Sequence, residues 1–238
     1  MTLTSRLLAV RARIAEAARR SGRDPASVTL VAVSKFQPVT AIEEAYAAGQ
    51  RVFGENRVQE IEEKKGLLTS LLARPDPLRL ELIGALQSNK ARKAVACVSR
   101  IQSIDSVELG VRVGRAASDL GVLMPVLVQV DLAGEVTKSG VPEEGLLSVL
   151  QTLASVAGIR VEGLMAIPPL LEDPEKVRPY FVRLRELRDQ AVERSLLNGR
   201  ELSMGMSHDF EAAIEEGATL VRVGTAIFGE RPPKTVRG

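Results

Sequence analysis

The segment LVAVSKFQP, residues Leu30 to Pro38, decides the fold class of this 238-residue chain. Its short apolar run is typical of a strand that is buried on both faces, as in parallel sheets. The run ends in Lys35, and a buried strand end rarely carries an ammonium group without a use for it. A desolvated lysine loses its proton readily and becomes a nucleophile, whereas its long stem can equally carry the charge out to solvent.

Strand-like and amphipathic segments alternate along the whole chain. The predicted strands are 30–35, 51–56, 78–84, 100–105, 125–131, 161–167, 201–206 and 220–225. The predicted helices between them are 40–48, 57–72, 87–97, 106–120, 142–156, 174–196 and 209–216. Alternation of this kind predicts parallel strands, and eight such units in about 250 residues predict a (β/α)8 barrel. The alternative is an open doubly wound sheet, which is disfavoured because no Gly-rich phosphate loop follows the first strand.

The composition excludes several classes of protein. Lys and Arg number 32 against 30 Asp and Glu, and aromatic residues make up only 3%, so a basic groove for nucleic acid is not indicated. No apolar stretch approaches the roughly 20 residues that span a membrane. The single cysteine, Cys97, excludes an internal disulfide and fits a reducing compartment, so we expect a cytoplasmic protein and a buried structural thiol.

The N-terminal segment from Thr2 to Arg20 carries five arginines and one acidic residue, a composition that resembles a transit peptide. The competing interpretation is a first helix whose apolar side chains recur at helical spacing, at Leu7, Val10, Ile14 and Ala18. We favour the helix, at about 3–21, as an extra element of a single domain that spans residues 1–238.

In a barrel of this type, the chemistry lies at the C-terminal ends of the strands. Near the last two strand ends, Ser207 is a predicted N-cap for the helix that begins near Asp209, and Gly224 and Thr225 offer a close backbone approach and a hydroxyl group. These groups suit a phosphate, although capping and turn formation alone explain them equally well. Arg222 lies within an apolar strand, so it either pairs with a neighbouring carboxylate or contacts a ring nitrogen of a bound cofactor.

A Schiff-base lysine, a phosphate site and a buried arginine together suggest pyridoxal 5′-phosphate (PLP). The motifs LVAVSK, VFGENRVQE, IGALQSNK, QSIDS, KSGV, GLMAI, LSMGMSHDFEAAI and VRVGTAIFG, spread from Leu30 to Gly229, resemble those of the PLP homeostasis proteins. The resemblance implies one (β/α)8 barrel similar to the N-terminal domain of alanine racemase, the type III fold of PLP proteins. It also implies that PLP is held as an internal aldimine, in a family without an established catalytic reaction.

The resemblance implies a role for each matching residue. Lys35 would hold the aldimine, and Arg222, which cannot accept a proton, would face the pyridine nitrogen and leave it unprotonated. The further residues implied to surround the cofactor are Asn56, Met206, Ser207, Gly224 and Thr225. The chain departs from the family pattern on the third strand, where Glu81 and Ala85 stand at positions that are often His. His208, the only histidine, is predicted to be an exposed first-turn residue.

We therefore expect a PLP-binding protein of vitamin B6 homeostasis without robust turnover, with PLP-dependent apo-enzymes as candidate recipients and no nucleic-acid, membrane or metal partner. We expect a monomer, with a weak dimer as the alternative. A racemase is the first alternative function, but such enzymes add a β-domain and a second acid–base tyrosine, and Tyr46 and Tyr180 both fall in predicted helices. The others are an aldolase-type enzyme that uses Lys35 and, last, an interaction module.

Overall fold

The computed structural model describes residues 1–134 and 139–230. Lys138, which begins the KSGV motif, lies outside the described residues, as does the proline-rich tail that starts at Arg231.

The described residues form nine strands, separated by helices and short 3₁₀ turns. The strands are β1 (Thr29–Val33), β2 (Val52–Glu55), β3 (Arg79–Leu82), β4 (Arg100–Ile104), β5 (Met124–Asp131), β6 (Val141–Pro142), β7 (Ile159–Ala166), β8 (Glu201–Ser203) and β9 (Leu220–Val223). The helices are α1 (Leu3–Arg20), α2 (Val39–Ala47), α3 (Val58–Leu67), α4 (Thr69–Leu72), α5 (Ala91–Cys97), α6 (Val107–Asp119), α7 (Leu146–Leu153), α8 (Arg178–Glu193), α9 (Phe210–Glu215) and α10 (Thr225–Phe228).

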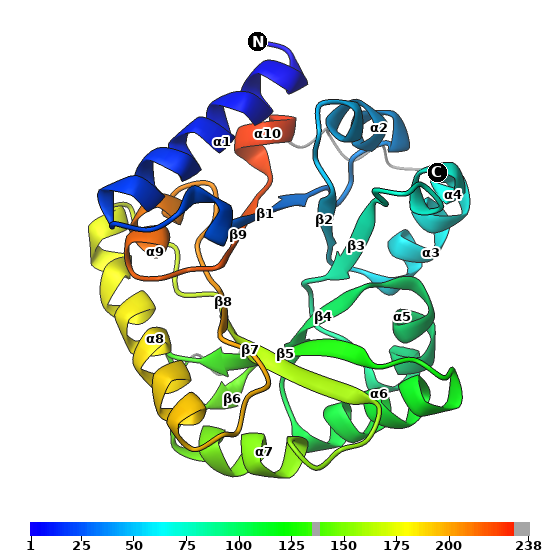
Figure 1. Ribbon diagram of the computed structural model, residues 1–238, viewed down its shortest axis with the longest axis vertical. Coiled ribbons are helices and arrows are strands. Elements are labelled where there is room, and N and C mark those ends of the chain that lie inside the picture. Colours follow the sequence, from blue (N-terminus) through cyan, green and yellow to red (C-terminus); the bar gives the residue numbers. More distant parts are fainter. Residues whose placement is uncertain (135–138, 231–238) are drawn as a thin grey trace, which may run out of the picture.

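The strands close into a parallel barrel, which confirms the predicted fold. The order around the barrel in the described residues is β1, β2, β3, β4, β5, β7, β8 and β9, and β9 pairs again with β1. Figure 1 shows the strands in the centre with the helices around them. The short β6 was not predicted; it pairs with the end of β5, where Val130 lies opposite Val141.

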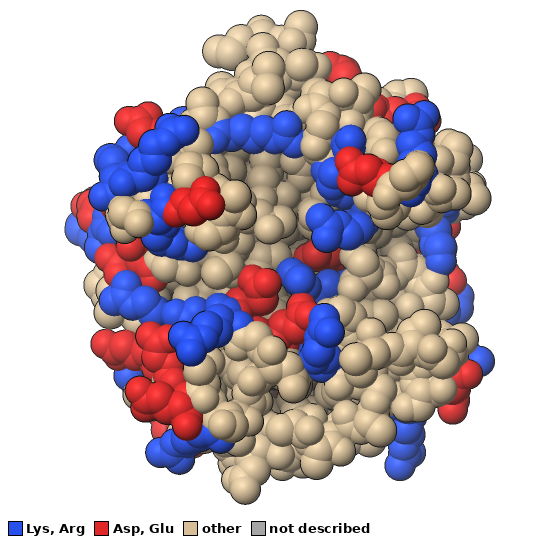
Figure 2. All heavy atoms as spheres, in the orientation of Figure 1, with Lys and Arg blue, Asp and Glu red and all other residues tan. Residues whose placement is uncertain are grey.

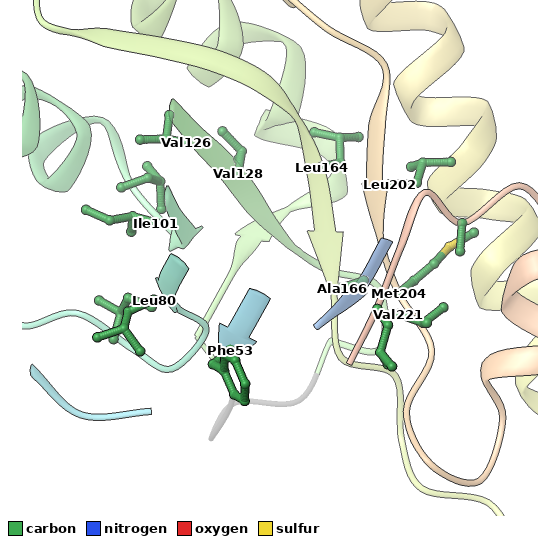
Figure 3. Packing of buried hydrophobic residues seen from close by; sticks show 14 of the residues in the cluster. Phe53, Leu80, Ile101, Val126, Val128, Leu164, Ala166, Leu202, Met204 and Val221 are labelled. Carbon is green, nitrogen blue, oxygen red and sulfur yellow. The ribbon is translucent and has the colours of Figure 1, made fainter. Parts of the chain in front are cut away.

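Alternation along each strand divides the apolar side chains into two sets. One set fills the layer between the barrel and the helices, and Figure 3 shows members of it on successive strands, among them Phe53, Leu80, Ile101, Val128 and Leu202. The other set fills the barrel itself and consists of Val31, Val52, Ile83, Leu127, Met165 and Leu220. The inner set is small because polar side chains occupy much of the remaining interior.

The predicted first helix is present as α1. Leu7, Val10, Ile14 and Ala18 are all buried, as their spacing predicts, and Thr2 caps the helix by accepting a hydrogen bond from the Ser5 N–H. Figure 1 shows α1 lying beside α9 and α10. No helix in residues 1–134 and 139–230 combines the length and the apolar character that crossing a membrane requires.

Three local predictions need correction. The predicted helix 57–72 is two helices, because the chain leaves helical geometry at Leu68. The predicted strand 201–206 ends at Ser203, since Gly205 adopts a φ of +90°, which ends extended pairing. Cys97 is half-buried rather than buried; burial raises the pKa of its thiol, so it is not an activated nucleophile.

Candidate functional site

The predicted site residues come from four neighbouring strand ends. Lys35 follows β1, and β1 pairs with β2 on one side and with β9 on the other. Asn56 follows β2, Gly224 follows β9, and Ser207 follows β8, the next strand along. Because parallel strands end at the same edge of a sheet, these four connections lie together at one mouth of the barrel.

Lys35 occupies a tight turn directly after β1. Val31 and Val33 face the barrel interior, and Lys35 stands two residues farther along, at the position that strand alternation assigns to the same face. Lys35 is half-buried. The turn is closed by a 3.0 Å hydrogen bond from the Gln37 N–H to the Ser34 carbonyl. Phe36 has a φ of +64°, a strained conformation for a non-glycine residue, and strain of this kind often marks a functional site.

A buried ion pair supports this turn from behind. The Lys64 Nζ donates to the Ser34 carbonyl at 2.8 Å, to Glu55 Oε1 at 2.7 Å and to Glu60 Oε1 at 2.7 Å. Glu60 Oε1 also accepts a hydrogen bond from the Phe36 N–H at 2.6 Å. Burial raises the pKa of Glu55, and the Lys64 charge opposes that rise. Lys64 was not predicted from the sequence, where its only signal is the i,i+4 spacing from Glu60.

The loops after β8 and β9 meet at Ser207 and Gly224. The Gly224 N–H donates to Ser207 Oγ at 3.3 Å, so the two predicted phosphate residues are in contact. A Cβ at Gly224 would lie 3.2 Å from the Val33 carbonyl oxygen, so the bare backbone brings this loop against the end of β1. Thr225 is exposed and is the first residue of α10, where backbone N–H groups have no helical acceptor.

The predicted N-cap at Ser207 is wrong. Helix α9 begins at Phe210, and Asp209 occupies the N-cap position. The buried Asp209 carboxylate accepts a hydrogen bond from the Met206 N–H at 2.6 Å, which fixes the loop that carries Met206 and Ser207. Ser207 is therefore held by Gly224 rather than by the helix that follows it.

Arg222 is buried in β9, with 4% of its surface exposed. Its Nη1 donates to Ser203 Oγ at 2.6 Å and its Nη2 donates to the Ala166 carbonyl at 2.8 Å. Among the described residues, no carboxylate lies within ion-pair distance of it, so the alternative of a direct carboxylate partner is wrong. Burial lowers the pKa of Arg222 to about 10, and the charge of Asp209 opposes that drop.

A cavity of about 600 Å³ opens at the ends of β2 and β3, beside Asn56. Its lining residues are Asn56, Arg57, Val58, Gln59, Ala85, Gln87 and Lys90. Gly84 packs so closely against the Asn56 backbone that a Cβ at Gly84 would lie 2.8 Å from Asn56 Cα. Ala85 also lines this cavity, whereas Glu81 is buried inside the barrel. His208 is exposed, as predicted, and its Nε2 lies 2.9 Å from the Glu172 carbonyl oxygen.

Comparison with known proteins identifies the family. The family model described as alanine racemase, N-terminal domain, matches residues 6–232. A PLP homeostasis protein of Aquifex aeolicus is 43% identical over 231 residues, which cover 97% of this chain and 99% of that protein. One of Escherichia coli K12 is 40% identical, covering 94% and 95% of the two chains. This chain belongs to the PLP homeostasis protein family.

Solved structures agree with this placement. PipY of Synechococcus elongatus PCC7942, with PLP bound, is 41% identical and has a TM-score of 0.83 over 96% of this chain and 100% of that one. An alanine racemase of Corynebacterium glutamicum has a TM-score of 0.67 at 18% identity, covering 95% of this chain and 61% of that one. The second likeness concerns the fold alone.

Proposed function

We propose that this chain binds PLP at the mouth formed by the ends of β1, β2, β8 and β9, and that it serves in PLP homeostasis. The observation that carries the proposal is the convergence of Lys35, the Ser207–Gly224 contact and the buried Arg222 on adjoining strands. A nucleophilic amine, an anion site and a fixed cation match the aldehyde, the phosphate and the pyridine nitrogen of one ligand.

The residues of this structure fit the group. Gly224 has no side chain where a Cβ would press on the Val33 carbonyl, so the loop after β9 lies directly against the end of β1, two residues before Lys35. Ser207 and Thr225 add hydroxyl groups, which can donate hydrogen bonds to a phosphate. Arg222 supplies a buried positive charge that no carboxylate within ion-pair distance neutralises in the part of the chain that the structure describes.

When bound, PLP would supply an aldehyde that condenses with an amine and a ring that withdraws electrons. Lys35 would provide that amine, positioned by the turn that Lys64 and Glu60 hold. Arg222 has only N–H donors, so it would direct a hydrogen bond at the ring nitrogen and keep a proton off it. A ring held in this state is a weak electron sink, which suits storage of the cofactor better than catalysis.

The two tyrosines do not supply a second acid–base group at this mouth. The Tyr46 hydroxyl donates to the Asp76 carbonyl at 2.7 Å, in the loop that enters β3 at the opposite end of the barrel. Tyr180 lies in α8 and packs against the core. These positions support a binding protein over a racemase. The proposal further includes PLP-dependent apo-enzymes as recipients of the cofactor, a monomeric state and a cytoplasmic location.

The test compares the absorption spectra of the wild type and of Lys35→Ala after incubation with PLP. We expect a visible band in the wild type that borohydride converts to a stable adduct on Lys35, detectable by peptide mass spectrometry. Lys35→Ala should lack both the band and the adduct. Lys93→Ala is the matched control, since the Lys93 side chain is exposed on α5 and pairs with Glu62, so it should leave both signals unchanged. A wild type that stays colourless with PLP would refute the proposal.

A further inference from the structure

The buried charge of Arg222 has neutral partners, Ser203 Oγ and the Ala166 carbonyl. A buried guanidinium without a counter-charge is unfavourable because it gives up its hydration. The charge of the buried Asp209 carboxylate opposes this effect. A second buried carboxylate, Glu81, is connected to Arg222 by a series of hydrogen bonds through the barrel.

This series of hydrogen-bonded side chains, which we call the interior relay, consists of Arg222, Ser203, Gln102 and Glu81. The Ser203 hydroxyl donates to Gln102 Oε1 at 2.6 Å, and Gln102 Nε2 donates to Glu81 Oε2 at 2.5 Å. Each of the four residues is at most 4% exposed. Ser203 is on β8 and Gln102 is on β4, which are not neighbours in the sheet, so the relay crosses the barrel interior.

The polarity of the relay follows from Arg222. A guanidinium can only donate, so Ser203 Oγ must accept from it. The Ser203 proton is then free to point at Gln102 Oε1, which leaves the Gln102 amide nitrogen facing Glu81 as a donor. Every bond therefore runs from the cation to the carboxylate, and bonds aligned in this way strengthen one another at low local dielectric.

Glu81 is itself held at the far end of the relay. Its Oε1 lies 3.7 Å from Arg100 Nη1, and Arg100 Nη2 lies 3.0 Å from Glu162 Oε2. Burial raises the pKa of Glu81, while Arg100 and the Gln102 hydrogen bond oppose that rise. On the face drawn in Figure 2, basic and acidic side chains gather around the hollow near the middle of the molecule.

We propose that Glu81 is a positioning residue for the cofactor. Through hydrogen bonds to Gln102 and from there to Ser203, it fixes the orientation of the Arg222 guanidinium, and it thereby sets how that guanidinium faces the pyridine ring. This inference rests on the proposed function, because it requires that Arg222 face the ring of bound PLP.

The test uses Glu81→Gln, which removes the charge and keeps the shape of the side chain. Cofactor-depleted protein is titrated with PLP, and both the dissociation constant and the absorption maximum of the bound form are measured. We expect affinity to fall about three- to tenfold and the absorption maximum to move. Glu216→Gln is the matched control: it removes another largely buried carboxylate, which pairs with Arg178 and Arg185 outside the relay, so neither quantity should change.

A double-mutant cycle separates the relay from general structural damage. Once Ser203→Ala has cut the relay, adding Glu81→Gln should have no further effect on PLP affinity. Gln102→Met provides a second cut that leaves the Arg222 contact with Ser203 intact, and thermal unfolding verifies that each variant folds. Additive losses, or an unchanged spectrum and affinity in Glu81→Gln, would overturn the inference while the proposed function stands. If the wild type itself binds no PLP, both fail.

Discussion

The Lys64 Nζ lies 2.7 Å from Glu55 Oε1, at a site where their side chains are 8% and 0% exposed. Lys64 belongs to α3 and Glu55 ends β2, so the pair fastens the helix to the barrel directly behind the turn that carries Lys35. An intact buried ion pair adds little net stability, because desolvation offsets its attraction, but removing one partner leaves an uncompensated charge inside the protein. This support therefore matters for both stability and the position of Lys35.

Lys64→Met should lower the free energy of unfolding by about 3–5 kcal/mol, because the Glu55 carboxylate loses its partner. It should also weaken PLP binding, since the Ser34 carbonyl loses the ammonium group that anchors the turn. Urea unfolding and PLP titration measure the two effects. Lys93→Met, which breaks an exposed pair with Glu62, is the control and should cost less than about 1 kcal/mol. Equal costs for the two variants would contradict this account.

Gly84→Ala should displace the connection that carries Asn56. Its Cβ would lie 2.8 Å from Asn56 Cα, closer than a backbone can tolerate without moving. We expect a loss of about 1–3 kcal/mol in unfolding free energy together with weaker PLP binding. Gly66→Ala, in α3 with open space around it, should instead stabilise the protein by up to about 1 kcal/mol. Unchanged PLP affinity in Gly84→Ala would remove Asn56 from the proposed site.

Arg222→Met should weaken both stability and PLP binding. Burial lowers the pKa of Arg222 to about 10, so the buried charge costs folding free energy at neutral pH, and removing it recovers that cost. The buried Ala166 carbonyl and Ser203 hydroxyl nevertheless lose their donor, so we expect the cofactor-free protein to lose about 1–3 kcal/mol of unfolding free energy, as measured by urea unfolding. PLP binding should weaken in the same variant, as measured by titration. A variant that gains stability would show that the desolvation of Arg222 outweighs its hydrogen bonds.

The ion pairs that join α1, α8 and α9 should make stability fall in acid. Burial favours a higher pKa for Glu215, but hydrogen bonds from Arg178 and Arg20 outweigh it and lower the pKa below its usual range. A carboxylate with a lowered folded pKa stabilises the fold above its unfolded pKa of about 4.3, and that contribution is lost as pH falls through the folded value.

Glu215→Gln should therefore cost less than about 1 kcal/mol at pH 7 and flatten the loss of stability below about pH 4. Urea unfolding at several pH values measures the slope. The same acid dependence in the wild type and the variant would show that Glu215 does not contribute to it.

The order of elements was predictable from the chain because local patterns encode it. Short apolar runs alternate with amphipathic segments, which predicts parallel strands joined by right-handed crossovers, and eight such units predict a closed barrel. Lys35 and Arg222 were recognisable for a related reason: each is a cation placed within or directly after an apolar strand, where hydration is lost. The prediction of Ser207 as an N-cap was wrong, because α9 begins at Phe210 with Asp209 at the N-cap position, and the Asp209 carboxylate accepts a hydrogen bond from the Met206 N–H.

Only the tertiary structure decided how these residues are held. Ser203 and Gln102 are 101 residues apart in the chain, and Lys64 meets the Ser34 carbonyl across 30 residues. No periodicity of helices or strands marks such pairs, since a polar residue in a strand has the same letter whether it faces solvent or another strand across the barrel. Closing the barrel brings them together, and in its dry interior each polar group must find a partner, so packing rather than local sequence selects the contacts that position Lys35 and Arg222.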